Sequence, residues 1–303
     1  MADKFLEKLN GAEKNVPLKD FTTYKIGGPA KYFFDAKNKE DLMFALKVAK
    51  NFKLPVFILG GGSNLLVSDK GFKGLVIKID ISGVKFQNKK VFVGAGMELS
   101  KLAYLSAEKG LSGLEWAAGI PGATIGGAIY GHAQAFGVKI SDAVKEVVAI
   151  NSKTLKIETF TKEQCRFSLK NSIFKKNKNL VIVSAVLDFK GKNADEIKNK
   201  IKEFLEHRKT RHPINFPSAG STFVNPEIKG ETIPAGALIA KCGLAGKKIG
   251  KAQISEMHAN FIVNLGGAKS KDVLALMNLA RKEVKNKFKI NLETEVQFVG
   301  FKK

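Results

Sequence analysis

Two stretches of the chain carry residue types that could bind or transform a ligand. Residues 217–226 read Pro-Ser-Ala-Gly-Ser-Thr-Phe-Val-Asn-Pro, so two prolines enclose hydroxyl side chains with little bulk around them. Residues 60–64, Gly-Gly-Gly-Ser-Asn, directly follow the apolar segment 56–59. Glycine lets backbone N–H groups approach an anion closely, and the serine and asparagine add donors. The first stretch could hold a serine against a ligand, and the second could hold a pyrophosphate.

Both stretches also have a plain structural interpretation. Gly, Pro, Asn and Ser build ordinary surface turns, and three glycines after a strand are compatible with a hairpin. The glycine stretch is neither a Walker loop, since no Gly-Lys-Ser/Thr ends it, nor a Rossmann loop, since the G-x-G-x-x-G spacing is absent. The residues of these stretches alone leave both interpretations open.

A third stretch, residues 113–130, is rich in glycine and holds the only tryptophan. Glycine loses conformational freedom on folding without returning side-chain contacts, so we expect something to approach this backbone closely. A flat cofactor would fit, and so would tight packing of another chain segment.

Elements that would position these stretches follow from hydrophobic spacing. We expect helices over residues 38–53, 98–109 and 194–208 and a last one from Val273 to Val284, because apolar residues recur there at helical intervals. Short apolar runs predict strands at 56–59, 75–79, 91–93 and 181–189. At 303 residues, two or three domains are expected.

Composition limits the classes of function. The net charge of +23 invites a nucleic-acid partner, but lysines scattered along the chain, with only four arginines, indicate a solvated basic surface that favours small anions. Two cysteines and four histidines show no metal-ligand spacing, so no metal is expected. We expect both cysteines to be buried thiols. The chain has no run of about 18 apolar residues and no signal-peptide pattern at its start, so we expect a cytoplasmic protein without a membrane partner.

An ordered set of motifs resembles one family. The set comprises K-I-G-G-P-A, G-G-G-S-N-L-L, G-I-P-G with a following G-G-A, P-S-A-G-S-T-F-x-N-P, H-A-N-F and L-E-x-E-V. The resemblance extends from about residue 15 to residue 300. Together they resemble UDP-N-acetylenolpyruvoylglucosamine reductase (the MurB family), of the type that lacks an extra substrate-binding loop. Each motif is weak alone, whereas the order of all six is specific.

The resemblance implies an α+β fold. A two-subdomain FAD-binding module of the PCMH/VAO type, residues 1–80 and 81–206, would precede a C-terminal α+β substrate-binding domain, residues 207–303. It implies a flavoenzyme of peptidoglycan precursor synthesis that uses FAD and NADPH to reduce UDP-N-acetylglucosamine enolpyruvate to UDP-N-acetylmuramate. The FAD-contacting residues would be Gly60, Gly61, Gly62, Ser63, Asn64, Gly119, Ile120, Pro121, Gly122, Gly126 and Gly127.

The resemblance also implies catalytic roles. Hydride addition to the vinyl carbon leaves carbanion character on the carbon that bears the carboxylate, so this carbon needs a proton and its charge needs delocalising. Ser221 matches the family's proton donor. Glu295, rather than Glu293, matches the glutamate that polarises the substrate carboxylate, and Lys170 stands where the family has an arginine.

This chain departs from the family pattern at several positions. Lys170 keeps the positive charge but lacks the planar fork of arginine, and Arg166 could compensate only if it lay beside Lys170, as helical spacing would allow. His132 and Gln134 replace the outer residues of an Asn-Ala-Gly motif, Val224 replaces a lysine, and His212 replaces a glutamine. His258 is compatible with a structural hydrogen bond or with a ligand contact.

Two other hypotheses stay open from the sequence. One is a related FAD-binding oxidoreductase with another substrate, or one impaired by Lys170. The other, less favoured, is a basic nucleic-acid-binding protein without catalysis. Oligomeric state and the choice between NADPH and NADH have no signature in the sequence.

Overall fold

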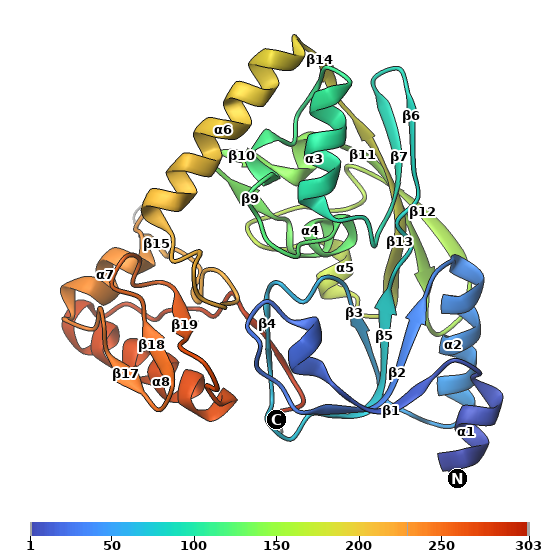
Figure 1. The fold of residues 1–303 in the computed structure, drawn as a ribbon, viewed down its shortest axis with the longest axis horizontal. Helices are drawn as coiled ribbons and strands as arrows, with labels where there is room; N and C mark the ends of the chain where they lie inside the picture. Colours follow the sequence, from blue (N-terminus) through green and yellow to red (C-terminus); the bar gives the residue numbers. More distant parts are fainter. Residues whose placement is uncertain (1, 229, 302–303) are drawn as a thin grey trace. The chain divides into compact units, whose positions relative to one another are not determined.

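The structure is a computed structural model that describes residues 2–228 and 230–301. The chain forms two compact units, each assembled from separated segments. Unit 1 comprises residues 1–16, 31–61 and 73–206, and unit 2 comprises residues 17–30, 62–72 and 207–303 (Figure 1). Each unit has its own core of buried apolar residues.

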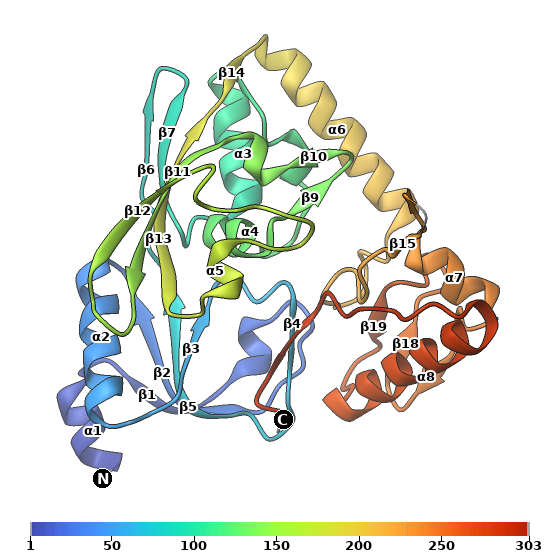
Figure 2. The same cartoon turned by 180° about the vertical axis from the view of Figure 1, so that it is seen from behind.

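The first sheet of unit 1 has four strands in the order β1-β2-β5-β3, with bounds Glu13–Pro17, Pro29–Ala36, Phe72–Ile79 and Val56–Leu59. β3 pairs with β5 in parallel. Helices α1 (Ala2–Lys8) and α2 (Lys39–Asn51) lie on one side of this sheet, as Figures 1 and 2 both show. Asn38 caps α2 by accepting a hydrogen bond from the Asp41 N–H over 2.8 Å. The cap and the buried apolar stripe explain why the helix begins here.

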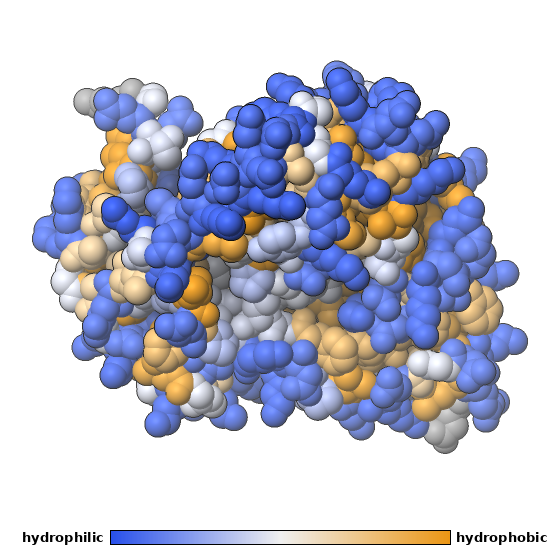
Figure 3. All heavy atoms as spheres, turned by 45° about the horizontal axis from the view of Figure 1, so that its top comes forward, coloured by the Kyte–Doolittle hydropathy of each residue, from blue (hydrophilic) through white to orange (hydrophobic). Residues whose placement is uncertain are grey.

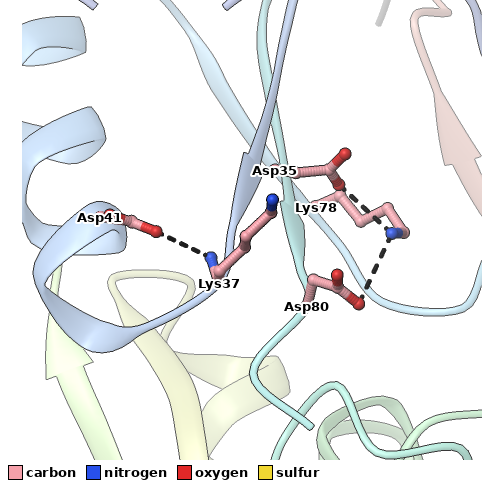
Figure 4. A network of polar contacts seen from close by, with 5 residues as sticks. All are labelled: Asp35, Lys37, Asp41, Lys78 and Asp80. Atoms are coloured by element: carbon pink, nitrogen blue, oxygen red, sulfur yellow. Dashed lines mark hydrogen bonds and ion pairs between the residues drawn. The ribbon is translucent and has the colours of Figure 1, made fainter. Parts of the chain in front are cut away.

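Polar contacts at the ends of β2 and β5 support the same sheet (Figure 4). Lys78 Nζ lies 3.2 Å from Asp35 Oδ1 and 3.7 Å from Asp80 Oδ1, so the ammonium of a β5 residue contacts one carboxylate on β2 and one just after β5. The backbone N–H of Lys37 donates to Asp41 Oδ2 over 3.0 Å, which fixes the turn from β2 into α2. These side chains are partly exposed, so each ion pair contributes little stability by itself.

The second sheet of unit 1 is antiparallel and has five strands in the order β12-β11-β13-β7-β6, with bounds Ile157–Thr161, Val144–Asn151, Leu180–Asp188, Lys90–Gly94 and Val84–Gln87. α4 (Ile125–Gly131) packs against β13 and β7, and α3 (Leu99–Glu108) lies nearby (Figure 2). Smaller elements complete the unit: β8 (Leu111–Ser112), β9 (Gln134–Ala135), β10 (Val138–Lys139), α5 (Ile173–Lys176) and β14 (Lys190–Gly191), with 3-10 helices at Glu115–Ala117 and Ile140–Asp142.

Unit 2 combines distant parts of the chain. β4 (Leu65–Val67) pairs in parallel with β20 (Gln297–Val299), and Tyr24, Ile26 and Leu66 share one core with residues of the C-terminal segment. The 3-10 helix Leu18–Phe21 belongs to the same unit. Its remaining elements are β15 (Glu227–Ile228), β16 (Glu231–Thr232), α7 (Ala235–Lys241), β17 (Lys248–Ile249), β18 (Ala252–Ile254), β19 (Ile262–Asn264) and α8 (Ser270–Phe288).

The expected helices and strands are confirmed, with small changes at their ends. α6 (Ala194–Arg211) extends three residues beyond its predicted end and α8 begins three residues before Val273. Asn193 Oδ1 accepts from the Asp195 N–H over 2.8 Å at the start of α6, as its position predicts. α3 ends before Gly110, whose φ of +66° is one that favours glycine.

Hydrophilic residues spread over much of the face seen in Figure 3, with small hydrophobic areas between them. This distribution is that of a largely solvated face. Among the described residues, no helix combines the length and apolar character needed to cross a membrane.

Candidate functional site

The glycine loops of unit 1 lie directly against each other. A Cβ added to Gly61 would meet the Gly122 carbonyl oxygen at 1.5 Å, and one added to Gly60 would meet Thr124 Oγ1 at 2.8 Å. Any side chain at Gly61 would therefore require the backbone to move. Chain-to-chain packing explains these two glycines, and it brings two of the predicted cofactor loops together.

The start of α4 is built by the same contacts. Thr124 caps the helix, because its Oγ1 accepts a hydrogen bond from the Gly127 N–H over 3.3 Å. Gly126 allows the helix to approach the second sheet, since a Cβ there would lie 2.8 Å from the Ala95 Cβ. Tight packing therefore accounts for Gly126 as well, while Gly127 is exposed.

These loops fit an anionic group. The backbone N–H groups of Gly61, Gly119 and Gly122 make no hydrogen bond within the described part of the chain. N–H groups that the fold leaves unused in a glycine-rich loop are the usual donors to a pyrophosphate. The residues present are therefore suited to FAD, whose pyrophosphate would accept hydrogen bonds from them.

Lys170 lies in unit 1, in a tight turn from Ser168 to Asn171 with a φ of +53°. The chain from Cys165 to Ser172 forms no helix, so Arg166 does not reach Lys170 by helical spacing. Arg166 instead lines a hollow of about 550 Å³ together with Glu158 and Gln164. The structure thus gives no support to compensation of Lys170 by Arg166.

Ser221 lies in unit 2, directly after Gly220, whose φ is +74°. Ser218 Oγ accepts from the Gly220 N–H over 3.4 Å, and the Ser218 carbonyl accepts from Thr23 Oγ1 over 2.7 Å. The predicted turn is therefore tied to the segment 17–30 of the same unit. Ser221 is half-buried, and its hydroxyl makes no hydrogen bond to any described residue.

Asn260, from the H-A-N-F motif, fixes the backbone after Ser221. Its carbonyl accepts from the Thr222 N–H over 2.7 Å, and its side chain bonds both backbone groups of Phe223. His258 Nδ1 accepts from the Asn260 N–H over 3.2 Å, which is the structural one of its two expected roles. No role for Asn260 was predicted, although it lay in a motif of the resemblance and a buried asparagine requires partners.

Glu295 lies beside the serine segment. Its N–H donates to the Thr222 carbonyl over 2.9 Å, and its carbonyl accepts from Asn64 Nδ2 over 3.2 Å. Glu295 is half-buried, whereas Glu293 is exposed. Unit 2 therefore brings Ser221, Glu295 and Asn64 into one small region, although they are far apart in sequence.

A cluster of histidines lies close to the serine segment. His212 stacks on His258 with ring centroids 5.5 Å apart and contacts the Phe261 ring at 5.4 Å. Burial, with the nearby charge of Arg208, lowers the pKa of His212 to about 4, and burial also lowers the pKa of His258. His212 Nδ1 is buried without a hydrogen-bond partner among the described residues, which agrees with a neutral ring.

Other reactive side chains form no second site. Cys165 is buried, as predicted, and burial raises the pKa of its thiol to about 12, so it is not a nucleophile at neutral pH. Cys242 is partly exposed, contrary to that prediction. Across the described residues, no three His, Cys, Asp or Glu side chains are placed to hold a metal ion.

Comparisons with known proteins point to one family of enzymes. Residues 30–154 match a family model described as an FAD binding domain, and residues 212–299 match one described as the C-terminal domain of UDP-N-acetylenolpyruvoylglucosamine reductase. Enzymes of that name from Anoxybacillus flavithermus and Bacillus subtilis are each 40% identical, covering 96% and 94% of this chain and 95% and 93% of their own. The crystal structure of the Thermus caldophilus enzyme superposes with a TM-score of 0.78 at 34% identity, covering 94% of this chain and 98% of its own.

Proposed function

The chain belongs to the UDP-N-acetylenolpyruvoylglucosamine reductase family, and we propose that Ser221, Glu295 and Lys170 are its catalytic residues. It is an FAD-dependent oxidoreductase that uses NADPH to reduce the enolpyruvyl group of UDP-N-acetylglucosamine enolpyruvate, giving UDP-N-acetylmuramate for peptidoglycan synthesis. The fold is α+β, with an FAD-binding module and a C-terminal substrate-binding domain. The single observation that carries the site proposal is the hydrogen bond from the Glu295 N–H to the Thr222 carbonyl, next to Ser221.

We assign the cofactor to the two glycine loops. Bound FAD supplies the redox chemistry, because it can take up a hydride from NADPH and deliver one to the vinyl carbon. The N–H groups of Gly61, Gly119 and Gly122 would donate to its pyrophosphate, and Ile120, Pro121, Gly126 and Gly127 would line the same loop. Gly60, Gly62, Ser63 and Asn64 complete the proposed contacts.

The residues of unit 2 would act on the carbon that bears the substrate carboxylate. When the vinyl carbon gains a hydride, this carbon gains an electron pair, and the Ser221 hydroxyl would donate a proton to it. A serine hydroxyl is a weak acid, so the proton transfer depends on close positioning. Asn260 and Gly220 supply that positioning, because they fix the backbone on both sides of Ser221.

Glu295 and Lys170 would polarise the substrate carboxylate. The ammonium of Lys170 would offset the negative charge that develops there, with less geometric precision than the guanidinium of arginine. The support for Lys170, which belongs to unit 1, is its place in the family motif.

We propose the domain roles in the same way. Residues 1–80 and 81–206 would form the two FAD-binding subdomains and residues 207–303 would bind the UDP-sugar. We also propose a cytoplasmic location, where NADPH and the UDP-sugar substrate would both be available.

Half-reactions measured separately test the function. The purified protein is expected to be yellow, to lose its flavin absorbance on anaerobic mixing with NADPH, and to regain it on mixing with UDP-N-acetylglucosamine enolpyruvate. Reduction by NADPH without reoxidation by this substrate would favour a related oxidoreductase with another substrate. A protein that cannot be reconstituted with FAD would contradict the function altogether.

A further inference from the structure

The turn that carries Lys170 is held in a strained conformation. The Ser168 N–H donates to the Asn171 carbonyl over 3.1 Å, and the Asn171 N–H donates to the Ser168 carbonyl over 3.0 Å. These two hydrogen bonds enclose Leu169 and Lys170. Lys170 has a φ of +53° at the third position of the turn, where type II turns use glycine or asparagine. A left-handed lysine costs about 1 kcal/mol, so its surroundings must hold it there.

His132 supplies one of the constraints. It lies just after α4, is 5% exposed, and places its Nδ1 2.6 Å from the Ser168 carbonyl oxygen. A carbonyl oxygen only accepts, so Nδ1 must carry the hydrogen. The other ring nitrogen, Nε2, lies 2.8 Å from Ser141 Oγ, and the ring stacks on Phe167 with centroids 4.9 Å apart. Both nitrogens and one face of the ring are therefore engaged.

Two further hydrogen bonds hold the backbone around the same turn. Lys175 Nζ donates to the Lys170 carbonyl over 2.7 Å, and the buried Ser172 donates from Oγ to the Tyr130 carbonyl over 2.8 Å. The Ser172 hydroxyl and the His132 ring thus connect the end of α4 to the chain on both sides of Lys170. His132 differs from the other contacts because its bond reaches Ser168, the residue that closes the turn.

We propose that His132 is a positioning residue, which fixes the Lys170 turn through the Ser168 carbonyl and so sets where the lysine ammonium meets the substrate carboxylate. This inference rests on the proposed role of Lys170. It also links two positions at which the chain departs from the family pattern, histidine for asparagine at 132 and lysine for arginine at 170, because one hydrogen bond joins their segments.

Two substitutions distinguish the contributions of the two ring nitrogens of His132, because each keeps a hydrogen-bonding group near only one of them. In His132→Asn the amide nitrogen lies near the former Nδ1 and can still donate to Ser168, whereas in His132→Gln it lies near Nε2 and can reach only Ser141. His132→Phe keeps the stacking on Phe167 and loses both hydrogen bonds. We expect flavin reoxidation by saturating substrate to slow about tenfold in His132→Gln and His132→Phe, and about twofold at most in His132→Asn. Flavin reduction by NADPH should stay within about twofold of the parent in all three.

Two readouts separate positioning from general damage to the fold. In a Lys170→Ala background, His132→Gln should cause no further slowing of reoxidation, since a positioning residue has nothing left to position. Hydrogen exchange of the Asn171 amide, measured without substrate, should be faster in His132→Gln than in the parent or in His132→Asn, because the turn is held less firmly.

Three results would overturn the inference. The first is equal slowing of flavin reoxidation in His132→Asn and His132→Gln. The second is a further tenfold slowing of reoxidation when His132→Gln is added to Lys170→Ala. The third is an unchanged rate of hydrogen exchange at the Asn171 amide in His132→Gln. If Lys170→Ala alone leaves reoxidation unchanged, the proposed role of Lys170 fails, and the proposed action of His132 on the substrate fails with it. The exchange measurement still shows in that case whether His132 holds the turn, so the two failures are distinguishable.

Discussion

Asn260 and Phe223 form a closed pair of hydrogen bonds in the core of unit 2. The Phe223 N–H donates to Asn260 Oδ1 over 2.9 Å, and Asn260 Nδ2 donates to the Phe223 carbonyl over 2.8 Å. Asn260 is 2% exposed and Phe223 is 1% exposed, so water cannot replace either bond. The Asn260 side chain thus satisfies the backbone of the segment that carries Ser221.

Asn260→Ala should therefore destabilise unit 2 by about 3 kcal/mol, because it leaves two buried backbone groups of Phe223 without partners. The calorimetric melting temperature measures this loss. Asn286→Ala is a matched control on the exposed surface of α8 and should change stability by at most about 0.5 kcal/mol. Equal melting temperatures for the two variants would contradict the structural role of Asn260.

Gly61→Ala tests the contact between the two glycine loops. Its Cβ would meet the Gly122 carbonyl oxygen at 1.5 Å, so the loops must separate, and we expect less bound FAD per protein and a lower melting temperature. Gly131→Ala is the control, since nothing lies within 4 Å of a Cβ there. Flavin absorbance per protein gives the readout, and a fully loaded, equally stable Gly61→Ala variant would refute the packing.

Lys170→Arg tests the departure at the proposed carboxylate contact. Restoring the planar guanidinium allows two parallel hydrogen bonds to a carboxylate, and we expect flavin reoxidation by substrate to accelerate about threefold to tenfold. Lys176→Arg, on the exposed side of α5, should leave the rate unchanged. If Lys170→Arg reoxidises its flavin no faster than the parent, the planar guanidinium is not needed at this position.

His212 should make stability depend on pH in the acidic range. Its pKa is about 4 in the folded protein and about 6.5 unfolded, so between these values the unfolded chain binds more protons and stability falls as pH falls. The loss should approach 1 to 2 kcal/mol at pH 4, allowing for partial exposure of the ring. His212→Gln should be less sensitive than the parent when melting temperatures at pH 4.5 and pH 7.5 are compared, and an unchanged sensitivity would contradict the shifted pKa.

The sequence predicts the local elements well because each depends on neighbouring residues. The helix from Lys39 follows from its apolar spacing and its Asn38 cap, and the strand 56–59 follows from its short apolar run. The order of the motifs was enough to identify the family, although no single motif was.

Contacts between residues far apart in the chain could not be predicted from the sequence. Nothing local indicates that segments 17–30 and 62–72 join the C-terminal unit, or that Gly61 packs on Gly122. From the sequence, a ligand and tight packing of neighbouring chain were both open explanations for these glycines. The structure shows neighbouring chain packed against Gly60, Gly61 and Gly126. Asn260 was missed for the same reason, since its partner lies 37 residues away.

The measurement that bears most directly on the proposed chemistry compares the two half-reactions of Ser221→Ala. The account predicts that NADPH reduces the flavin at the parent rate, while substrate reoxidises it far more slowly, by about a hundredfold or more, because the proton donor is missing. Ser218→Ala, in the same turn, should affect both rates little. Equal loss of both half-reactions in Ser221→Ala, or reoxidation at the parent rate, would contradict the assignment of Ser221 as the proton donor.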